Sequence, residues 1–221
     1  MKRILLPLVL ILTVFSSVIA QKEKIVYGDN VTKREISSFH AVETSSGIEV
    51  IMSKGDKEEL AVSVGNTAYL NEVKTVVENG ILKISRSEDW KFWREWKNWK
   101  VKIYVSYTSM DAIKASSGGS VNITDLSLEK LTVRMSSGGI VTLSGTVAAL
   151  DVDGSSGGQF RGYSLTAEHC HAEASSGAGI QVTVNKEISA KANSGGFVRF
   201  KGEGLIRDIN VNSGGSVKRQ S

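Results

Sequence analysis

Cysteine and proline are almost absent from this sequence of 221 residues. The single cysteine, Cys170, has no second thiol to pair with, so an intramolecular disulfide framework is excluded. The single proline, Pro7, lies near the start. The rest of the chain therefore suits continuous strand ladders, because proline cannot donate a backbone hydrogen bond. The formal net charge is only +4, which gives no reason to expect nucleic acid as a partner.

Long hydrophobic runs are also scarce, and the one that exists lies at the start, over residues 4–15. It follows the basic pair Lys2-Arg3 and precedes the small-residue stretch that ends at Ala20, which together predict a signal peptide over residues 1–20. The run is too short for a membrane-spanning helix, which needs about 20 residues. We therefore expect no transmembrane segment and an exported protein, located in the periplasm, at the outer-membrane surface or outside the cell.

The feature that the sequence has in abundance is a short serine-glycine phrase that returns at a fixed period. Its copies share two small polar residues followed by glycine: Ser116–Gly119, Ser136–Gly139, Ser155–Gly158, Ser175–Ala178, Asn193–Gly196 and Asn212–Gly215. Successive copies begin 18 to 20 residues apart, and an earlier copy lies at residues 45–47. A fixed period of this size is typical of stacked repeats.

The residues around each phrase alternate with a period of two, which is typical of strands. Apolar or small residues recur four positions before and four positions after the second residue of the phrase, as in Val133 and Val141. Polar residues fill the columns between them. The phrase itself is predicted to be a corner, because glycine permits the positive φ of a tight bend. The same residue type recurs once per period, which favours parallel stacking over ordinary hairpins. The expected fold is all-β, a parallel β-helix whose coils have about 19–20 residues.

We expect an N-terminal β segment over residues 21–110, with a first coil near 36–52, followed by the parallel β-helix over residues 111–221. Within the N-terminal segment, Asn66 is expected to cap a short helical turn. Asn79-Gly80 predicts a hairpin, because a type I′ turn requires positive φ. Parallel stacking also predicts that Arg134 lies beside Asp153. It likewise places Glu173 beside Lys191.

The last coil carries Arg219 where the pattern calls for an apolar residue. This basic end is expected either to protect an open sheet edge or to be a frayed tail.

All four tryptophans fall within ten residues and are interleaved with basic residues. This Trp-rich segment supplies the predicted ligand or surface contacts Trp90, Trp93, Trp96, Trp99, Arg94 and Lys97. In one interpretation the rings stack on sugars or enter a membrane interface, while the cations meet acidic glycans or anionic lipid. In the other interpretation the rings cover the open end of the β-helix and the cations remain in water.

Residues that suggest chemistry are few. His169 and His171 are expected to share an outer face, while Cys170 points inward. Two histidines are too few ligands for a closed metal site. Asp151 and Asp153 share an outer face, with Arg134 and Arg161 expected near them, an arrangement that suits either a lyase-like site or a paired surface. No base recurs beside the serine column. We therefore expect no catalytic residue, no metal and no cofactor.

The signal peptide, the opening stretch over residues 36–55 and the serial Ser-Ser-Gly-Gly corners resemble the "putative auto-transporter adhesin, head GIN domain" family of Bacteroidetes envelope proteins. The resemblance covers residues 39–221. It implies a right-handed β-helix, no recognised catalytic residues and a role in adhesion. The Trp-rich segment departs from the family pattern.

The functional hypothesis is a non-enzymatic, adhesin-like envelope module that binds a glycan, cell-surface or protein partner, with homo-oligomers left open. The alternatives are a glycan-active enzyme on a β-helix scaffold and a purely structural envelope protein.

Overall fold

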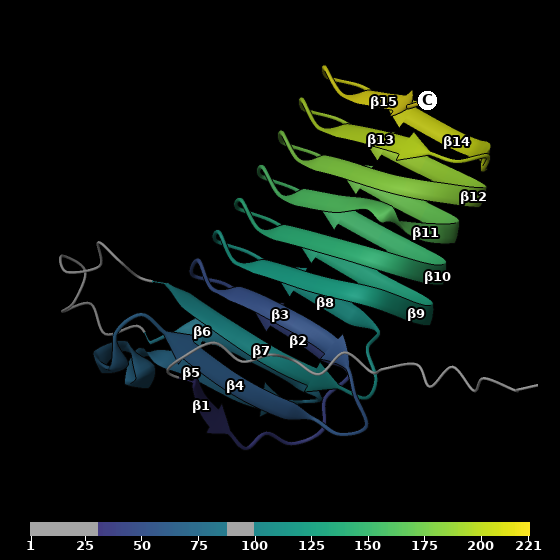
Figure 1. Ribbon diagram of the computed structural model, residues 1–221. Coiled ribbons are helices and arrows are strands. Elements are labelled where there is room, and N and C mark those ends of the chain that lie inside the picture. The colour runs from purple at the N-terminus through teal and green to yellow at the C-terminus, as the bar shows by residue number, and fades with distance from the viewer. Residues whose placement is uncertain (1–30, 88–99) are drawn as a thin grey trace, which may run out of the picture.

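A computed structural model of the protein describes residues 31–87 and 100–221, and strands dominate it (Figure 1). The first part contains β1 (Val31–Arg34), β2 (Ala41–Thr44), β3 (Glu49–Lys54), β4 (Glu59–Val64), the 3₁₀ helix η1 (Thr67–Glu72), β5 (Val73–Glu78), β6 (Ile81–Arg86) and β7 (Val101–Tyr107). The second part contains β8 (Ala112–Ala115), β9 (Ser120–Met135), β10 (Ile140–Gly154), β11 (Gln159–Ala174), β12 (Gly179–Ala192), β13 (Phe197–Lys201), β14 (Leu205–Val211) and β15 (Ser216–Arg219).

The second part is a β-solenoid, as the period predicted. Each of the long strands β9 to β12 forms most of one coil, and neighbouring coils pair in parallel. The first half of each long strand lies in a front layer and the second half in a back layer (Figure 1). Between the halves the pairing register shifts, for example between Leu143 and Gly145, where the strand bends from one layer to the other.

The serine-glycine phrases form a stack of corners along one edge of the solenoid, as predicted (Figure 1). In each corner a serine and the following glycine both have positive φ, as in Ser137 at 48° and Gly138 at 73°. The amide of Gly138 donates to the carbonyl of Ser156 in the next corner over 3.1 Å. The same bond joins each corner of the stack to the next, down to the amide of Gly47, which donates to the carbonyl of Ser117 over 3.1 Å.

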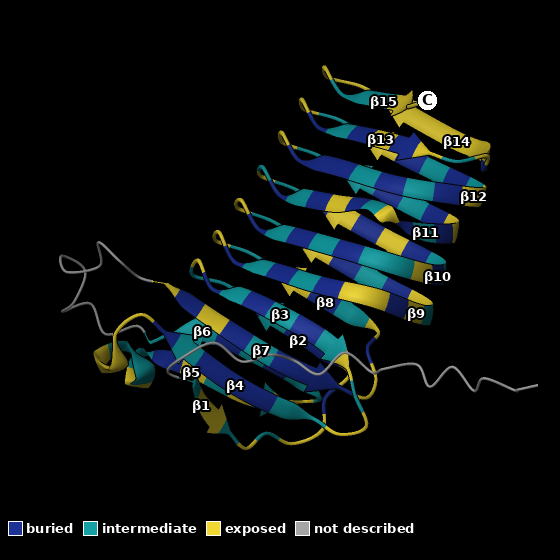
Figure 2. Ribbon diagram, viewed as in Figure 1, coloured by how far each residue is buried: buried dark blue, intermediate teal, exposed yellow. Residues whose placement is uncertain are grey.

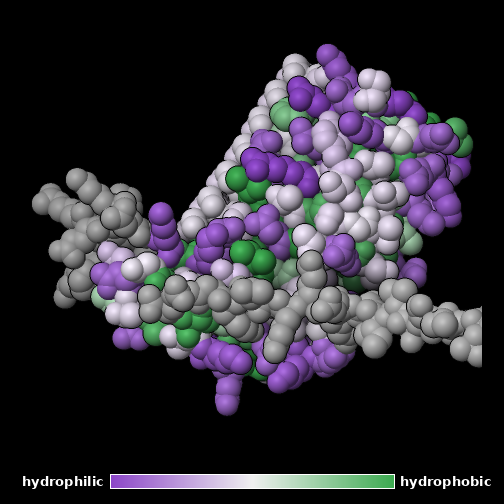
Figure 3. Space-filling model, in the orientation of Figure 1, coloured by the Kyte–Doolittle hydropathy of each residue, from purple (hydrophilic) through white to green (hydrophobic). Residues whose placement is uncertain are grey.

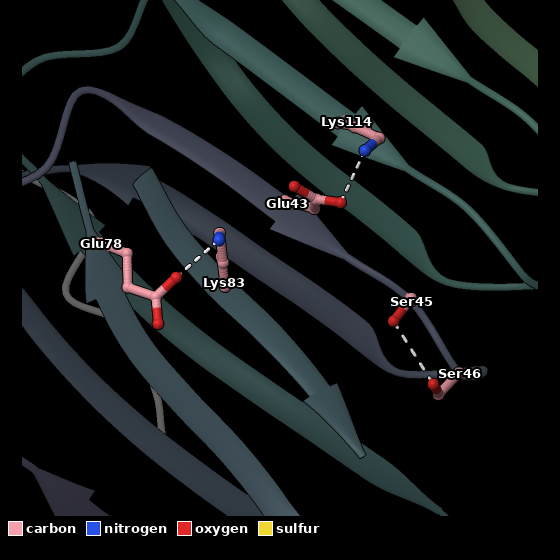
Figure 4. A network of polar contacts seen from close by, with 6 residues as sticks. All are labelled: Glu43, Ser45, Ser46, Glu78, Lys83 and Lys114. Carbon is pink, nitrogen blue, oxygen red and sulfur yellow. Dashed lines mark hydrogen bonds and ion pairs between the residues drawn. The ribbon is translucent and has the colours of Figure 1, made fainter. Parts of the chain in front are cut away.

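The first coil therefore belongs to the same stack as the later coils, although 71 residues separate its corner from the next. Strand β2 pairs in parallel with β8, and β3 pairs in parallel with β9. Lys114 Nζ lies 2.7 Å from Glu43 Oε1 across this junction (Figure 4). On the other side of the first coil, β6 pairs with β2 and β7 pairs with β3. The residues between β3 and β8 thus extend both layers beyond the first coil, on the side away from β8 and β9.

The local predictions for the N-terminal segment are confirmed. Strands β5 and β6 form an antiparallel hairpin around Asn79 and Gly80, whose φ values are 52° and 75°. The side chain of Asn66 accepts a hydrogen bond from the amide of Ala68 at the start of η1. Strands β4 and β1 then add to the front layer in antiparallel fashion.

The core lies between the two layers and consists of the predicted inward columns. The columns that contain Val133 and Val141 are buried through the central coils, and buried residues largely alternate with more exposed ones along the long strands β9 to β12 (Figure 2). Burial of these columns supplies the main stabilisation, at about 25 cal/mol for each Å² of apolar surface removed from water. The last coil differs, because no further coil covers it in this structure, and all of β14 is exposed.

Arg219 closes part of this end instead of fraying. Its guanidinium donates to the carbonyls of Gly202 and Gly204 over 2.7 and 2.6 Å and lies 5.0 Å from the centre of the Phe200 ring. The cation therefore covers the last large aromatic residue of the core.

Candidate functional site

The predicted contact residues of the Trp-rich segment lie outside the described residues. Trp90, Trp93, Trp96, Trp99, Arg94 and Lys97 all fall in the range 88–99. The candidate site is therefore built from the two broad surfaces of the solenoid.

The front face is the outer surface of six strand segments that stack in the front layer. They cover residues 120–124, 140–144, 159–163, 179–183, 197–201 and 216–220. None of these segments contains Asp or Glu, whereas the outward residues of the segments include Arg161, Arg199, Lys201 and Lys218. In the space-filling view from the same side, purple side chains stand among paler ones on the upper part of the molecule (Figure 3). The six segments of the front face are therefore basic and contain no carboxylates.

One column of the front face runs across all six segments. In register it contains Asn122, Thr142, Arg161, Gln181, Arg199 and Lys218, each directly opposite the next. Its cations, like Lys201 in the neighbouring column, are exposed. Within the described part of the chain, Arg161, Arg199, Lys201 and Lys218 form no ion pair. These charges are thus available to an external anion.

Two aromatic rings lie beneath these cations. The Arg199 guanidinium lies 4.8 Å from the centre of the Phe197 ring, and Lys201 Nζ lies 5.1 Å from the centre of the Tyr163 ring. Both rings are half-buried on the strand surface. Cations held against ring faces are partly preorganised, because the contact restricts their long side chains.

A groove of about 390 Å³ lies at the centre of the front face. Its lining consists mainly of hydroxyl and amide side chains with one cation: Asn122, Thr124, Thr142, Ser144, Arg161, Tyr163, Ser164 and Gln181, together with Ile123 and Leu143. Thr183 Oγ1, beside the groove, donates to the carbonyl of Tyr163 over 2.8 Å. The groove offers mostly apolar surface, with some neutral donors and acceptors, next to positive charge.

The back face is formed by residues 112–115, 128–135, 147–154, 167–174, 187–192 and 205–211. It differs from the front face because it carries carboxylates, several of which pair with cations. Glu173 Oε1 lies 2.7 Å from Lys191 Nζ and 2.9 Å from His171 Nε2, and these hydrogen bonds hold the pKa of Glu173 below its usual range. Arg207 and His169 similarly hold the pKa of Glu187 low, chiefly through the hydrogen bond from Arg207. Glu173 and Lys191 lie on adjacent strands, as the stacking register predicted. Arg134 and Asp153 are also directly opposite each other.

A second groove, of about 300 Å³, lies on this back face and tests the lyase-like hypothesis. It is lined by Asp151, His169, His171, Glu187 and Arg207 among others. The expectation that Arg161 lies near Asp151 is wrong. Arg161 is in the first half of β11, on the front face, because the bend within each long strand separates the two halves. The pKa values of Glu173 and Glu187 move down, as in structural ion pairs, whereas a general acid requires a raised pKa.

The His169-Cys170-His171 stretch has the predicted orientation. Cys170 is buried, and burial raises the pKa of its thiol to about 12. The two histidines point outward to Glu187 and Glu173. Among the residues that the structure describes, no three of His, Cys, Asp and Glu are arranged to hold a metal ion.

Sequence reasoning placed the front-face residues in an outward column but did not identify them as a site. The available signal was the position of acidic residues within the period. Apart from Asp125 and Glu203, which lie between segments, every Asp and Glu beyond residue 111 falls in the half-period before a corner. Because each half-period forms one layer, this pattern separates the charges between two faces.

The chain belongs to the family described as "Putative auto-transporter adhesin, head GIN domain", which matches residues 38–204. The resemblance seen in the sequence is therefore confirmed. No curated protein matches the sequence. Among the described residues, no helix is long and apolar enough to cross a membrane.

Several solved structures are similar to this chain, and the first of those described next has the same fold. A putative adhesin from Bacteroides fragilis has a TM-score of 0.70 at 18% identity, over 87% of this chain and 98% of that one. A putative adhesin from Parabacteroides merdae has a TM-score of 0.48 at 12% identity, over 87% and 96% of the two chains. A structure from Parabacteroides distasonis described as a putative lipid binding protein has a TM-score of 0.46 at 14% identity, over 87% and 96%.

Proposed function

We propose that this chain is an exported, non-enzymatic, adhesin-like module of the cell envelope whose front face binds a glycan, cell-surface or protein partner. In this proposal residues 1–20 direct export, residues 21–110 close one end of the solenoid, and residues 111–221 present the binding surface. The observation that carries it is the front face itself, which has unpaired cations, two half-buried rings and a groove lined by both apolar surface and polar groups.

The test is a binding screen with the mature chain, from residue 21 onward, on arrays of glycans and envelope proteins and on intact envelopes. Arg161→Glu combined with Arg199→Glu should abolish most of the binding, because it reverses charge at the centre of the front face. Lys130→Glu is the matched control, because Lys130 is an exposed cation on the back face. Equal binding by all three proteins would contradict the proposal.

The Trp-rich segment remains a separate prediction with its own variant. Trp93→Ala combined with Trp96→Ala should weaken binding to glycans or membranes if these rings are contacts. Unchanged binding would leave the front face as the sole contact surface proposed.

The enzymatic alternative is tested in the same screen by measuring the chain length of each polysaccharide before and after incubation. A non-enzymatic module leaves the length unchanged. Shortening that depends on Asp151 would instead favour a lyase-like activity on the back face. A purely structural protein would show neither binding nor shortening.

A further inference from the structure

We infer that the ligand of the front face is a linear polysaccharide with repeated acidic groups, bound along the stacking axis of the solenoid. This inference rests on the proposed function and names the chemical class of its ligand. It is carried by the spacing of the cations, the chemistry of the groove and the absence of protruding apolar side chains on this face.

Arg199 and Lys218 form a like-charged pair on the front face. These two exposed cations lie directly opposite each other on adjacent parallel strands, β13 and β15. Neighbouring strands lie about 4.8 Å apart, and like charges in this relation destabilise a sheet. The back face also places like charges opposite each other, as in Lys114 and Arg134, but there each charge has an opposite charge on its other side. That column contains, in order, Glu43, Lys114, Arg134, Asp153, Glu173 and Lys191. Arg199 and Lys218 have no acidic neighbour in their own column, whose other residues are Asn122, Thr142, Arg161 and Gln181, which indicates that an external anion completes the pair.

The front-face cations are arranged along the stacking axis of the solenoid. Arg161 belongs to the same column as Arg199, with only Gln181 between them. Two strand spacings separate the backbones of the two arginines by about 10 Å. The column therefore presents positive charge at intervals along the solenoid axis, perpendicular to the strands. A linear polymer with repeated acidic groups can meet Arg161, Arg199 and Lys218 in succession, whereas a single small anion cannot.

The groove of the front face lies beside these cations and reaches β9. Asn122, Thr142 and Gln181 belong to the same column as the cations. Thr124, Ser144, Tyr163 and Ser164 line the groove beyond that column. Sugar hydroxyls both donate and accept hydrogen bonds, and amide and hydroxyl side chains do the same. Tyr163 adds a half-buried ring whose apolar face suits a sugar ring. The lining thus fits the uncharged parts of a polysaccharide chain.

A lipid surface fits this face less well. Among the described residues, the large apolar side chains that are exposed are Val76, Leu205, Ile206, Ile209 and Val211, and none of them lies on the front face. The Phe197 ring is covered by Arg199. The front face thus lacks the protruding apolar residues that an interfacial membrane contact requires.

The experiment measures binding of the mature chain by isothermal titration calorimetry at low and high salt. The probes are dextran sulfate and polygalacturonate, with unmodified dextran as the neutral polymer and phosphatidylglycerol vesicles as the anionic lipid. The variant Arg199→Gln with Lys218→Gln removes the like-charged pair. Arg134→Gln is the control, since it removes one exposed cation from a back-face column. Thermal unfolding establishes that each variant is folded.

The inference predicts that at least one acidic polymer binds, that dextran does not, and that salt weakens the binding. The double variant should weaken it about tenfold or more, because two exposed cations can no longer form charge-assisted hydrogen bonds with the polymer. The control should bind as the unmodified chain does. Preference for vesicles, or binding to neither acidic polymer, would overturn the inference.

A further variant, Thr142→Arg, separates this inference from the proposed function, because it fills the groove without removing a cation. If dextran binds as well as dextran sulfate and Thr142→Arg blocks both, the acidic class is wrong while the front face remains the binding surface. If no probe or envelope partner depends on any front-face variant, the proposed function fails as well.

Discussion

The Cβ of Ala178 lies in the space that Gly154 leaves by having no side chain. A Cβ on Gly154 would be 3.2 Å from it, closer than ordinary van der Waals contact. Ala178 occupies the last place of its corner, where five other corners have glycine, and Gly154 occupies an inward column where its neighbours have Met135 and Ala174. The added methyl group of Ala178 therefore fits because Gly154, one coil earlier, has no side chain. The two positions are coupled because each corner packs closely against the preceding coil.

The two glycines of a single corner should respond differently to alanine. A Cβ on Gly139 would lie 2.1 Å from the carbonyl oxygen of Ala115, so Gly139→Ala should lower the free energy of unfolding by about 2–3 kcal/mol. A Cβ on Gly138 would have nothing within 4 Å, but the φ of 73° is unfavourable for alanine. Gly138→Ala should therefore lower the free energy of unfolding by only about 1–2 kcal/mol. Urea unfolding measures both.

Asparagine provides the control for this pair, because it tolerates the left-handed region better than alanine does. Gly138→Asn should be milder than Gly138→Ala, while Gly139→Asn should be at least as harmful as Gly139→Ala. Equal effects at the two positions would contradict the view that Gly138 is required for its positive φ and Gly139 for its lack of a Cβ.

Removing the Arg219 side chain should loosen the C-terminal end of the solenoid locally. Arg219→Ala removes two hydrogen bonds, to the carbonyls of Gly202 and Gly204, and uncovers the Phe200 ring. Net contributions of about 1 kcal/mol for each hydrogen bond predict faster amide exchange in β15 by one to two orders of magnitude, roughly. Hydrogen exchange detects this.

The matched control is Lys218→Ala, on the same strand but pointing to the front face. It should leave exchange in β15 nearly unchanged. Exchange rates in β10 should not respond to either substitution, and a change there would indicate global destabilisation instead of local opening.

Acid should remove a stabilising contribution from Glu173. Its pKa is lowered in the folded state by Lys191 and His171, so the contribution is present above the unfolded pKa and is lost as the pH falls through the folded value. Glu173→Gln should therefore be slightly less stable than the unmodified chain at neutral pH, by a small amount because the pair is solvent-exposed.

At a pH below the folded pKa of Glu173, the two proteins should have the same contribution from this position. Urea unfolding at neutral and strongly acidic pH measures the difference. A stability gap that stays constant across this range would show that the effect is not electrostatic.

Cys170 should be inert in the folded protein. Burial raises the pKa of its thiol to about 12, and the thiolate is the reactive species. Iodoacetamide should leave Cys170 unmodified under mildly alkaline native conditions and label it fully after denaturation, which mass spectrometry quantifies. Because the unfolded thiol ionises at about pH 8.5, stability from this group should also decline above that pH. Rapid labelling of the native protein would contradict its position in the core.

The local elements were predictable because their signals are short in range. Asn79-Gly80 specifies a hairpin through its φ values alone, and Asn66 caps η1 with an atom two residues from its partner. The inward columns around Val133 and Val141 were predictable for the same reason, since alternation within a strand determines which side chains can be buried together.

The placement of Arg161 was not predictable from its column, and the candidate site depends on it. Arg161 and His171 belong to one strand, β11, yet lie on opposite faces of the molecule because that strand bends between the layers. Alternation identifies an outward residue but not which of two outer surfaces it joins. The front face therefore emerged only when the bend in each coil was known.

By itself the sequence determined the period, the corners and the parallel register, because each coil repeats the same local requirements for φ, space and burial. The tertiary structure decided how residues separated by 71 positions, such as Glu43 and Lys114, become neighbours in one stack. It also decided that the front-face segments carry cations without carboxylates, whereas on the back face carboxylates such as Glu173 and Glu187 pair with cations. The reason is physical: local backbone rules act within a coil, whereas charges and grooves are assembled by contacts between coils.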